Sequence, residues 1–393
     1  MLIVLIILVL AILAVVTGIT SAVKFVSKKN KEKIQEEEKP KDIMINLVAT
    51  GDVMCHTTNF NAAYNNETKE YDFTSVFANI SKYITKADVA IGNLETTFAG
   101  KDRGYTGYPT FNSPSALGVA LKNIGIDVLS TANNHSLDKG YTGIVSTLDK
   151  LDEIGIDHMG TARSEEEQNK VLVKDVNGIK IAFLSYTYGT NGIPVPAGKE
   201  YSVNLIDKDL ILKQINLAKE QNVDIICASM HWGDEYKQKQ NKKQEELADY
   251  LFQNGVDIII GNHAHVIEPM EKRKIALEDG TEKEVFVVYA LGNFISGQTI
   301  EHTKSTVILD MNIRKNGENG KITIDSINYI PVYCYDESKK NSNRYELLDI
   351  REEIAKYENN SEGKVETSLY QILKSELENI EKILGSIAET SNG

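Results

Sequence analysis

The chain has 393 residues, of which 41% are apolar and 25% are charged, and this composition is typical of a globular protein with a sizeable core. The net charge of -13 argues against general binding to nucleic acid, and no basic-aromatic module is present. The three cysteines (Cys55, Cys227 and Cys334) are too few and too scattered for a disulfide framework or a zinc knuckle, so we expect buried free thiols.

The first 23 residues are almost wholly apolar and carry no charged side chain. At about 1.5 Å per residue, a helix of this length spans a hydrocarbon core of about 30 Å. A cleaved signal peptide and a buried helix are the alternatives. The basic region that opens a signal peptide is missing and the apolar run is long, so we expect an uncleaved transmembrane anchor over residues 1–23.

Residues 24–42 are rich in charged side chains and predict a solvated linker or a frayed helix. The lysines that follow the anchor favour a cytoplasmic location for the rest of the chain under the positive-inside rule. Long domains can cross the membrane despite such flanking charge, so this indication is weak.

Short strands and amphipathic helices alternate along the rest of the chain, which predicts an α/β fold. An Asn-Gly pair at residues 177–178 predicts a hairpin beside the parallel strands. The expected strands cover 43–50, 88–91, 127–131, 156–160, 171–175, 180–185, 224–229, 256–260, 284–290, 306–313 and 322–329. The expected helices cover 72–86, 115–124, 142–154, 207–221, 240–254 and 369–387.

Side chains able to bind a metal follow five of the apolar strands. Parallel strands of one sheet bring their carboxyl ends to one rim, so these residues are expected to meet in one cleft. They are Asp52, Asn93 with Glu95, Asn134 with His135, His231, and His263 with His265.

The two histidines of the last cluster are two residues apart. An extended backbone would place both imidazoles of His263 and His265 on one side, an arrangement suited to a late first-row metal. The alternative is a pair of loop histidines with no ligand role. For Asp52, the alternative is a helix N-cap or a turn.

The set contains too many ligands for a structural tetrahedral zinc site, and no cysteine cluster accompanies it. It suits two divalent cations about 3.5 to 4 Å apart that share a carboxylate. Histidine and oxygen ligands allow Mn, Fe or Zn.

Six motifs in this order resemble the CapA family of poly-γ-glutamate capsule synthesis, within the calcineurin-like metallophosphoesterase superfamily. They are GDVMCH, GNLETTF, ANNHSLDKG, HWGDEY, GNHAHVIEPME and YALGNF, and the resemblance covers residues 44–300. It implies a four-layer αββα sandwich over residues 43–335, followed by a helical tail over 336–393.

The resemblance also implies roles for the clustered residues. Asp52 and His265 would hold the first metal, and Glu95, or Asn93 in its place, would bridge. The second metal would be held by Asn134, His231 and His263. His135 matches the histidine that assists the leaving group.

Two motifs depart from the wider superfamily. The Asp-x-His of the first motif is absent, and His56, four residues after Asp52, is the only histidine near enough in sequence to replace it. The second motif has Gly-Asn-Leu-Glu where Gly-Asp is usual. Both departures concern metal affinity.

Three functions therefore stay open: a membrane-anchored factor for making or exporting poly-γ-glutamate, a metallophosphoesterase, and a metal-binding scaffold without turnover. The net negative charge weighs against a polyanionic ligand unless bound metals neutralise it locally. The anchor weighs in favour of a surface polymer, and we expect the soluble domain to lie outside the cell. The expected partners are the membrane and other capsule-synthesis subunits.

Overall fold

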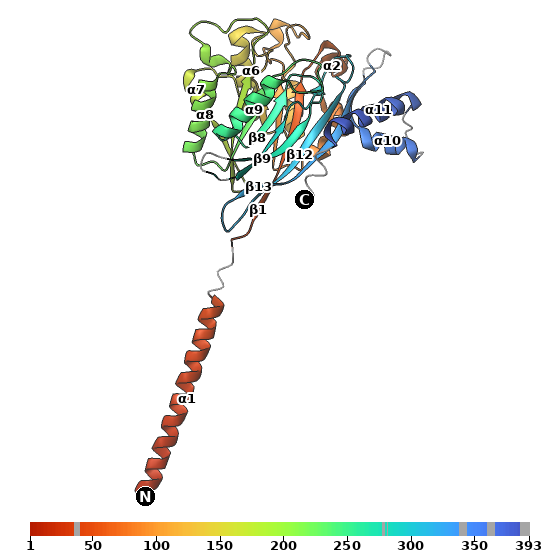
Figure 1. Cartoon of the computed structure of the whole chain (residues 1–393). Helices are drawn as coiled ribbons and strands as arrows, with labels where there is room; N and C mark the ends of the chain where they lie inside the picture. The colour runs from red at the N-terminus through yellow and green to blue at the C-terminus, as the bar shows by residue number, and fades with distance from the viewer. Residues whose placement is uncertain (35–39, 277–279, 281, 338–343, 360–365, 386–393) are drawn as a thin grey trace. The chain divides into compact units, whose positions relative to one another are not determined.

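The computed structural model describes residues 1–34, 40–276, 280, 282–337, 344–359 and 366–385 (Figure 1). The chain divides into two compact units. One contains Met1–Ile43 and Asn316–Lys321, and the other contains Met44–Lys315 and Ile322–Gly393.

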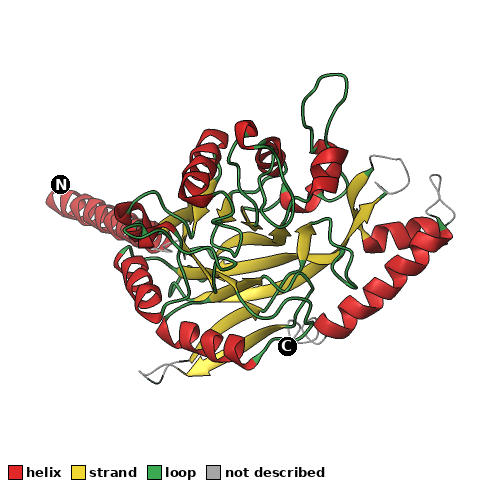
Figure 2. Ribbon diagram, turned by 90° about the horizontal axis from the view of Figure 1, so that it is seen from above, coloured by secondary structure: helices red, strands yellow, loops and turns green. Residues whose placement is uncertain are grey.

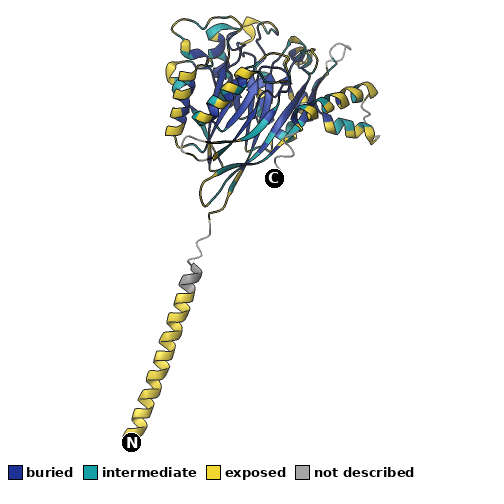
Figure 3. Ribbon diagram, viewed as in Figure 1, coloured by how far each residue is buried: buried dark blue, intermediate teal, exposed yellow. Residues whose placement is uncertain are grey.

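The first unit contains helix α1 (Leu2–Ile34). Within it, Leu2–Lys29 is the one stretch of the described residues that is long and apolar enough to cross a membrane. The side chains are exposed along the whole of this stretch (Figure 3). The helix continues past residue 23 into the charged segment.

The second unit holds two sheets. Strands β14-β13-β12-β1-β2-β3-β4 form one sheet, with β11 paired to β1, and β5-β6-β7-β8-β10-β9 form the other. The strands are β1 (Ile43–Val53), β2 (Val89–Leu94), β3 (Val128–Ser130), β4 (Asp157–Met159), β5 (Leu172–Val176), β6 (Ile179–Thr187), β7 (Ile225–His231), β8 (Ile258–Asn262), β9 (Met270–Ala276), β10 (Glu282–Val288), β11 (Asn293–Ile295), β12 (Ser305–Lys315), β13 (Ile322–Asp336) and β14 (Tyr345–Asp349).

Helices surround the strands in the view of Figure 2. The α-helices of this unit are α2 (Thr57–Ala62), α3 (Thr74–Phe77), α4 (Ser81–Ile84), α5 (Ala116–Asn123), α6 (Gly140–Ile154), α7 (Glu165–Asn169), α8 (Lys208–Glu220), α9 (Lys242–Asn254), α10 (Ile350–Glu358) and α11 (Thr367–Leu384). Helix α9 begins with a capping box between Asn241 and Gln244 and ends at Gly255 in the left-handed conformation.

Each sheet is covered on both faces, which explains why its strands are apolar runs rather than alternating ones. Val48 of β1 packs with Leu117 and Leu121 of α5 on the helix side, while its neighbours Leu47 and Ala49 are also fully buried. In the second sheet, alternate residues of β6 pack against α8 and α9. A hydrogen bond of 2.7 Å between the hydroxyls of Ser130 and Ser185 joins β3 to β6. The expected αββα sandwich is confirmed.

The hairpin is also confirmed: β5 and β6 pair antiparallel around Asn177 and Gly178, both at positive φ. The single helix expected over residues 72–86 is wrong. Two short helices, α3 and α4, replace it, and Asn79 between them donates a hydrogen bond to the backbone oxygen of Leu347 in β14. That edge strand lies within the stretch expected to be a helical tail, and it extends the first sheet.

Candidate metal centre

The polar residues at the strand ends come from two sheets and not from one. β1, β2 and β3 carry Asp52, Asn93 and the loop to His135, whereas β7 and β8 carry His231 and lead to His263. The assumption that these strands belong to one sheet is therefore wrong. The two sheets face each other, and their carboxyl ends meet at one edge, as direct contacts between their side chains show.

Asp52 links the two sheets. Its Oδ1 accepts a hydrogen bond from Asn93 Nδ2 at 2.8 Å, and its Oδ2 accepts one from the backbone N–H of His263 at 3.2 Å. Asn293 lies beside it in register on β11. Gly51 permits this approach, because a Cβ there would lie 1.9 Å from the carbonyl oxygen of Gly292. Asp52 is fully buried.

The histidine pair does not lie in an extended backbone. His263 and His265 both follow the end of β8 and have positive φ values of 96° and 60°. Such conformations are uncommon away from glycine and cluster at functional sites. The bond to Asp52 and a 2.8 Å bond from Tyr236 N–H to the Ala264 oxygen hold the turn. The two imidazole rings still lie near each other, with centroids 6.0 Å apart.

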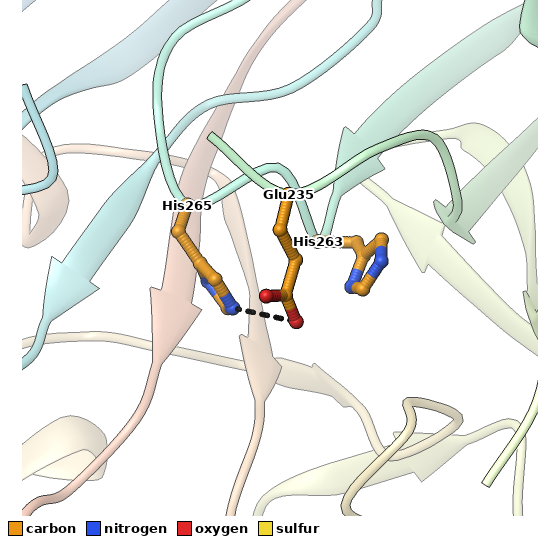
Figure 4. A group of neighbouring side chains, drawn as sticks. All are labelled: Glu235, His263 and His265. Carbon is orange, nitrogen blue, oxygen red and sulfur yellow. Dashed lines mark ion pairs between the residues drawn. The ribbon is translucent and has the colours of Figure 1, made fainter. Parts of the chain in front are cut away.

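Glu235 joins this pair (Figure 4). One atom each of Glu235, His263 and His265 lie within 4.8 Å of one another, close enough to share a metal ion. His265 Nε2 is 4.0 Å from Glu235 Oε1. Glu235 is 40% exposed at its side chain and both histidines are buried, so this group faces the opening of the site.

Asp52, Glu95 and His231 form a second, fully buried group that meets the same distance criterion. Glu95 Oε1 is 3.6 Å from His231 Nε2 and 4.0 Å from His265 Nε2, so this carboxylate lies between the two groups. Asn93, the alternative for the bridging position, donates its amide hydrogen to Asp52 and is already engaged.

These residues fit a divalent cation. Both carboxylate oxygens of Glu95 and Nδ1 of His263 are buried without a hydrogen-bond partner among the described residues. Burial, followed by repulsion from Asp52, raises the pKa of Glu95 well above its usual value. A cation between the groups would satisfy these orphaned atoms and supply the opposing charge.

His231 and His263 favour the neutral form, which has a lone pair to offer a cation. Burial and the neighbouring imidazoles lower the pKa of His263 to about 3 and that of His231 well below its usual value. In the third histidine, His265, Nδ1 lies 3.1 Å from Asn293 Oδ1. The Asn293 amide nitrogen already donates to Gln298 and Thr303, so its oxygen faces His265 and Nδ1 must be the donor. His265 therefore presents Nε2 to the carboxylates.

Asn134 lies with His231: its Oδ1 is 2.8 Å from His231 Nε2. The next residue, His135, pairs through Nδ1 with Asp138 Oδ2 at 2.7 Å, and both side chains are buried. Asn191 lies against both, since its oxygen accepts from Asn134 Nδ2 at 3.2 Å and its nitrogen is 3.5 Å from His135 Nε2.

His56 takes no part in either group. Its Nδ1 accepts a hydrogen bond from the backbone N–H of Gly297 at 3.0 Å. Its ring packs edge-on against Phe111, which also contacts His135. Burial lowers the pKa of His56 to about 4.

Sequence reasoning missed three residues of the site: Glu235, Asn293 and Asp138. Each lies in one of the motifs at the end of a strand, and this position could have identified it as a candidate. Glu235 was overlooked because it lies four residues beyond His231, at the far side of a turn.

A family model described as bacterial capsule synthesis protein PGA_cap matches residues 46–298. Capsule biosynthesis protein CapA of Bacillus anthracis is 28% identical over 256 residues, which cover 63% of this chain and 60% of that protein. PGA biosynthesis protein CapA of Bacillus subtilis is 33% identical over 199 residues, or 50% of each chain. The chain thus spans half to three fifths of the length of these relatives.

Among solved structures, the NAD nucleotidase of Haemophilus influenzae aligns with 88% of this chain and 64% of its own at a TM-score of 0.46 and 13% identity. A phosphatase from Mycoplasma pneumoniae aligns with 76% of this chain and 97% of its own at a TM-score of 0.43 and 15% identity.

Proposed function

This chain belongs to the bacterial capsule synthesis protein family PGA_cap, and from that premise we propose that it is a membrane-anchored factor in making or exporting poly-γ-glutamate, with a dinuclear metal site. Residues 1–23 would form the anchor, 24–42 the linker and 43–335 the working domain, outside the cell. Other capsule-synthesis subunits would be its partners. The relatives of Bacillus anthracis and Bacillus subtilis, whose names place them in capsule and PGA biosynthesis, support this proposal.

One observation carries the metal site: the orphaned, buried carboxylate of Glu95 belongs to one group of metal-capable side chains and lies 4.0 Å from His265 of the other. We propose that Glu95 is shared by two cations of Mn, Fe or Zn. Asp52 and His265 would hold one, and Asn134, His231 and His263 the other. Bound divalent cations supply Lewis-acid charge that polarises a carbonyl or phosphoryl oxygen.

The chain's own proton donor would be His135. The carboxylate of Asp138 accepts the Nδ1 proton of His135 and also a 2.6 Å hydrogen bond from the backbone N–H of Phe111, so its position is fixed. That contact orients the imidazole and leaves Nε2 available, so that in the imidazolium form the Nε2 proton could pass to a leaving group. This pair is the observation that favours the second candidate, a metal-dependent hydrolase for a phosphoester or γ-glutamyl bond.

Metal analysis of the purified full-length chain tests the site. The double variant His263→Ala, His265→Ala should lose bound metal while keeping its secondary structure. His158→Ala is the matched control, because His158 lies outside both groups and contacts Asp152. Unchanged metal content in the double variant would refute the site.

Turnover assays on the same preparation separate γ-glutamyl chemistry from phosphoester chemistry. Cleavage or transfer of γ-glutamyl peptide that is lost in His135→Ala supports the capsule function with catalysis. Turnover of a phosphodiester alone supports the phosphoesterase. Metal binding without either reaction would leave a metal-binding scaffold as the function.

A further inference from the structure

A short basic segment follows directly after the candidate ligand Glu235. Residues 237–243 contain four lysines and no acidic residue, in a protein whose net charge is -13. All four side chains are exposed. We call residues 237–243 the basic segment.

The lysines of the basic segment make few direct ion pairs, although acidic residues flank the segment at 234–235 and 245–246. Lys242 Nζ lies 3.5 Å from Glu246 Oε1, but the two side chains are 85% and 65% exposed, so water and salt screen this pair. In the part of the chain that the structure describes, no carboxylate lies within ion-pair distance of Lys237, Lys239 or Lys243.

The basic segment is fixed beside the metal centre. At its start, the Tyr236 backbone N–H is bonded to the oxygen of Ala264, between the two candidate histidines, and the Tyr236 ring lies 5.9 Å from that of His265. At its end, the capping box of Asn241 and Gln244 anchors it to α9.

A groove of about 640 Å³ takes in the end of the basic segment. It is lined by Tyr188, Trp232, Asp234, Lys242 and Lys243, among others. The ring of Tyr188 lies 4.5 Å from that of His263, so one end of the groove borders the candidate metal centre. The groove also holds the carboxylate of Asp234, which keeps its negative charge and whose Oδ2 accepts a 2.8 Å hydrogen bond from Asn241 Nδ2.

We propose that this groove and the basic segment bind successive carboxylates of a γ-glutamyl polymer while the metal centre holds the unit that is acted on. This inference rests on the proposed function. Each repeat of such a polymer presents one carboxylate and a short methylene stretch, which match the lysine ammonium groups and the half-exposed ring of Tyr188. The local positive charge would let an acidic protein attract a polyanion.

Binding of fluorescently labelled oligo-γ-glutamate to the full-length, metal-loaded chain in detergent tests the proposal. The triple variant Lys237→Gln, Lys239→Gln, Lys243→Gln should bind roughly tenfold more weakly at 0.1 M salt, mainly through slower association, and should show a weaker salt dependence. The matched control is Lys69→Gln, Lys170→Gln, Lys213→Gln, which removes the same charge from exposed lysines elsewhere.

Each result decides something. Weaker binding in the first variant alone, with unchanged metal content, supports the groove. Equal binding by the wild type and the first variant, or an equal loss in both triple variants, overturns it. No binding of oligo-γ-glutamate by the metal-loaded wild type refutes the proposed substrate instead. Stronger binding of polyphosphate with the same lysine dependence would assign the basic segment to a phosphate polymer and overturn the carboxylate proposal.

Discussion

Asn293 sets which nitrogen of His265 is available to a cation. Its side-chain oxygen accepts the Nδ1 proton of His265, while its own amide hydrogens go to Gln298 and to the backbone oxygen of Thr303. Contacts of this kind behind a metal ligand fix its tautomer and ring orientation.

We therefore expect Asn293→Ala to weaken metal binding by about 10- to 100-fold, the usual cost of losing such a partner. Competition against a chelator of known affinity measures this. Asn293→Asp, which keeps an acceptor for the same proton, should recover most of the loss. Equal affinity in the alanine variant and the wild type would show that His265 needs no such support.

Glu268 is a buried carboxyl outside the ligand set. Its Oε2 accepts a 2.7 Å hydrogen bond from Gln244, and Oε1 has no hydrogen-bond partner in the described part of the chain. Burial raises its pKa from 4.5 to about 8. The folded state thus holds this proton more tightly than the unfolded chain does, so the contribution of Glu268 to stability is fully present below about pH 4.5 and is lost as the pH rises toward 8.

Glu268→Gln should remove this pH dependence, because an amide is neutral throughout and still accepts from Gln244. At about 1.4 kcal/mol per pH unit, we expect a gain in unfolding free energy of up to about 3 kcal/mol at pH 7 and little change at pH 4. Urea unfolding at several pH values measures this. A gain that is the same at every pH would point to packing rather than to ionisation.

At the scale of the element, close backbone contact keeps β1 and β11 together at the site. A Cβ on Gly51 would lie 1.9 Å from the Gly292 carbonyl oxygen, so the two strands could not keep the register that places Asp52 beside Asn293.

Gly51→Ala should lower the unfolding free energy by about 3 kcal/mol, at the upper end of the usual cost of overpacking. It should also reduce the metal content. Gly189→Ala is the control, because no atom lies within 4 Å of a Cβ built there and its φ is not positive. If both alanine variants unfold at the same denaturant concentration as the wild type, the contact is less rigid than this argument requires.

The sequence predicted most elements because their signals are local. The Asn-Gly turn at 177–178 is an example. The break between α3 and α4 was not predictable in this way, because it depends on Asn79 bonding to a strand more than two hundred residues later. The positions of Asp52 and Glu95 at a strand end could be read from the sequence. The division of the candidate ligands between two sheets could not, since no local pattern records which sheet a strand enters.

At the scale of the whole molecule, the proposed location outside the cell gives a test. The exposed, apolar stretch Leu2–Lys29 is followed by the charged linker, and proteases cut preferentially in such segments. Protease added to intact cells should release a soluble fragment that contains the domain, and an antibody to its C-terminal end should detect the loss from the membrane.

Lysed cells provide the control, because the same fragment should then appear whatever the sidedness. Protection in intact cells together with cleavage after lysis would place the domain in the cytoplasm, as the lysines after the anchor indicate.

The division of the candidate ligands between two sheets has a consequence for biosynthesis. The early half of the chain supplies Asp52 and Glu95, the later half supplies His231, His263 and His265, and the supporting Asn293 comes later still. A partly synthesised polypeptide would contain only part of the candidate ligand set, so a cation could bind the full set only after both halves of the chain had folded together. A bound ion would then hold the two sheets together. In cells starved of that metal, the protein would have its full length, but the contact between its two sheets would be weaker.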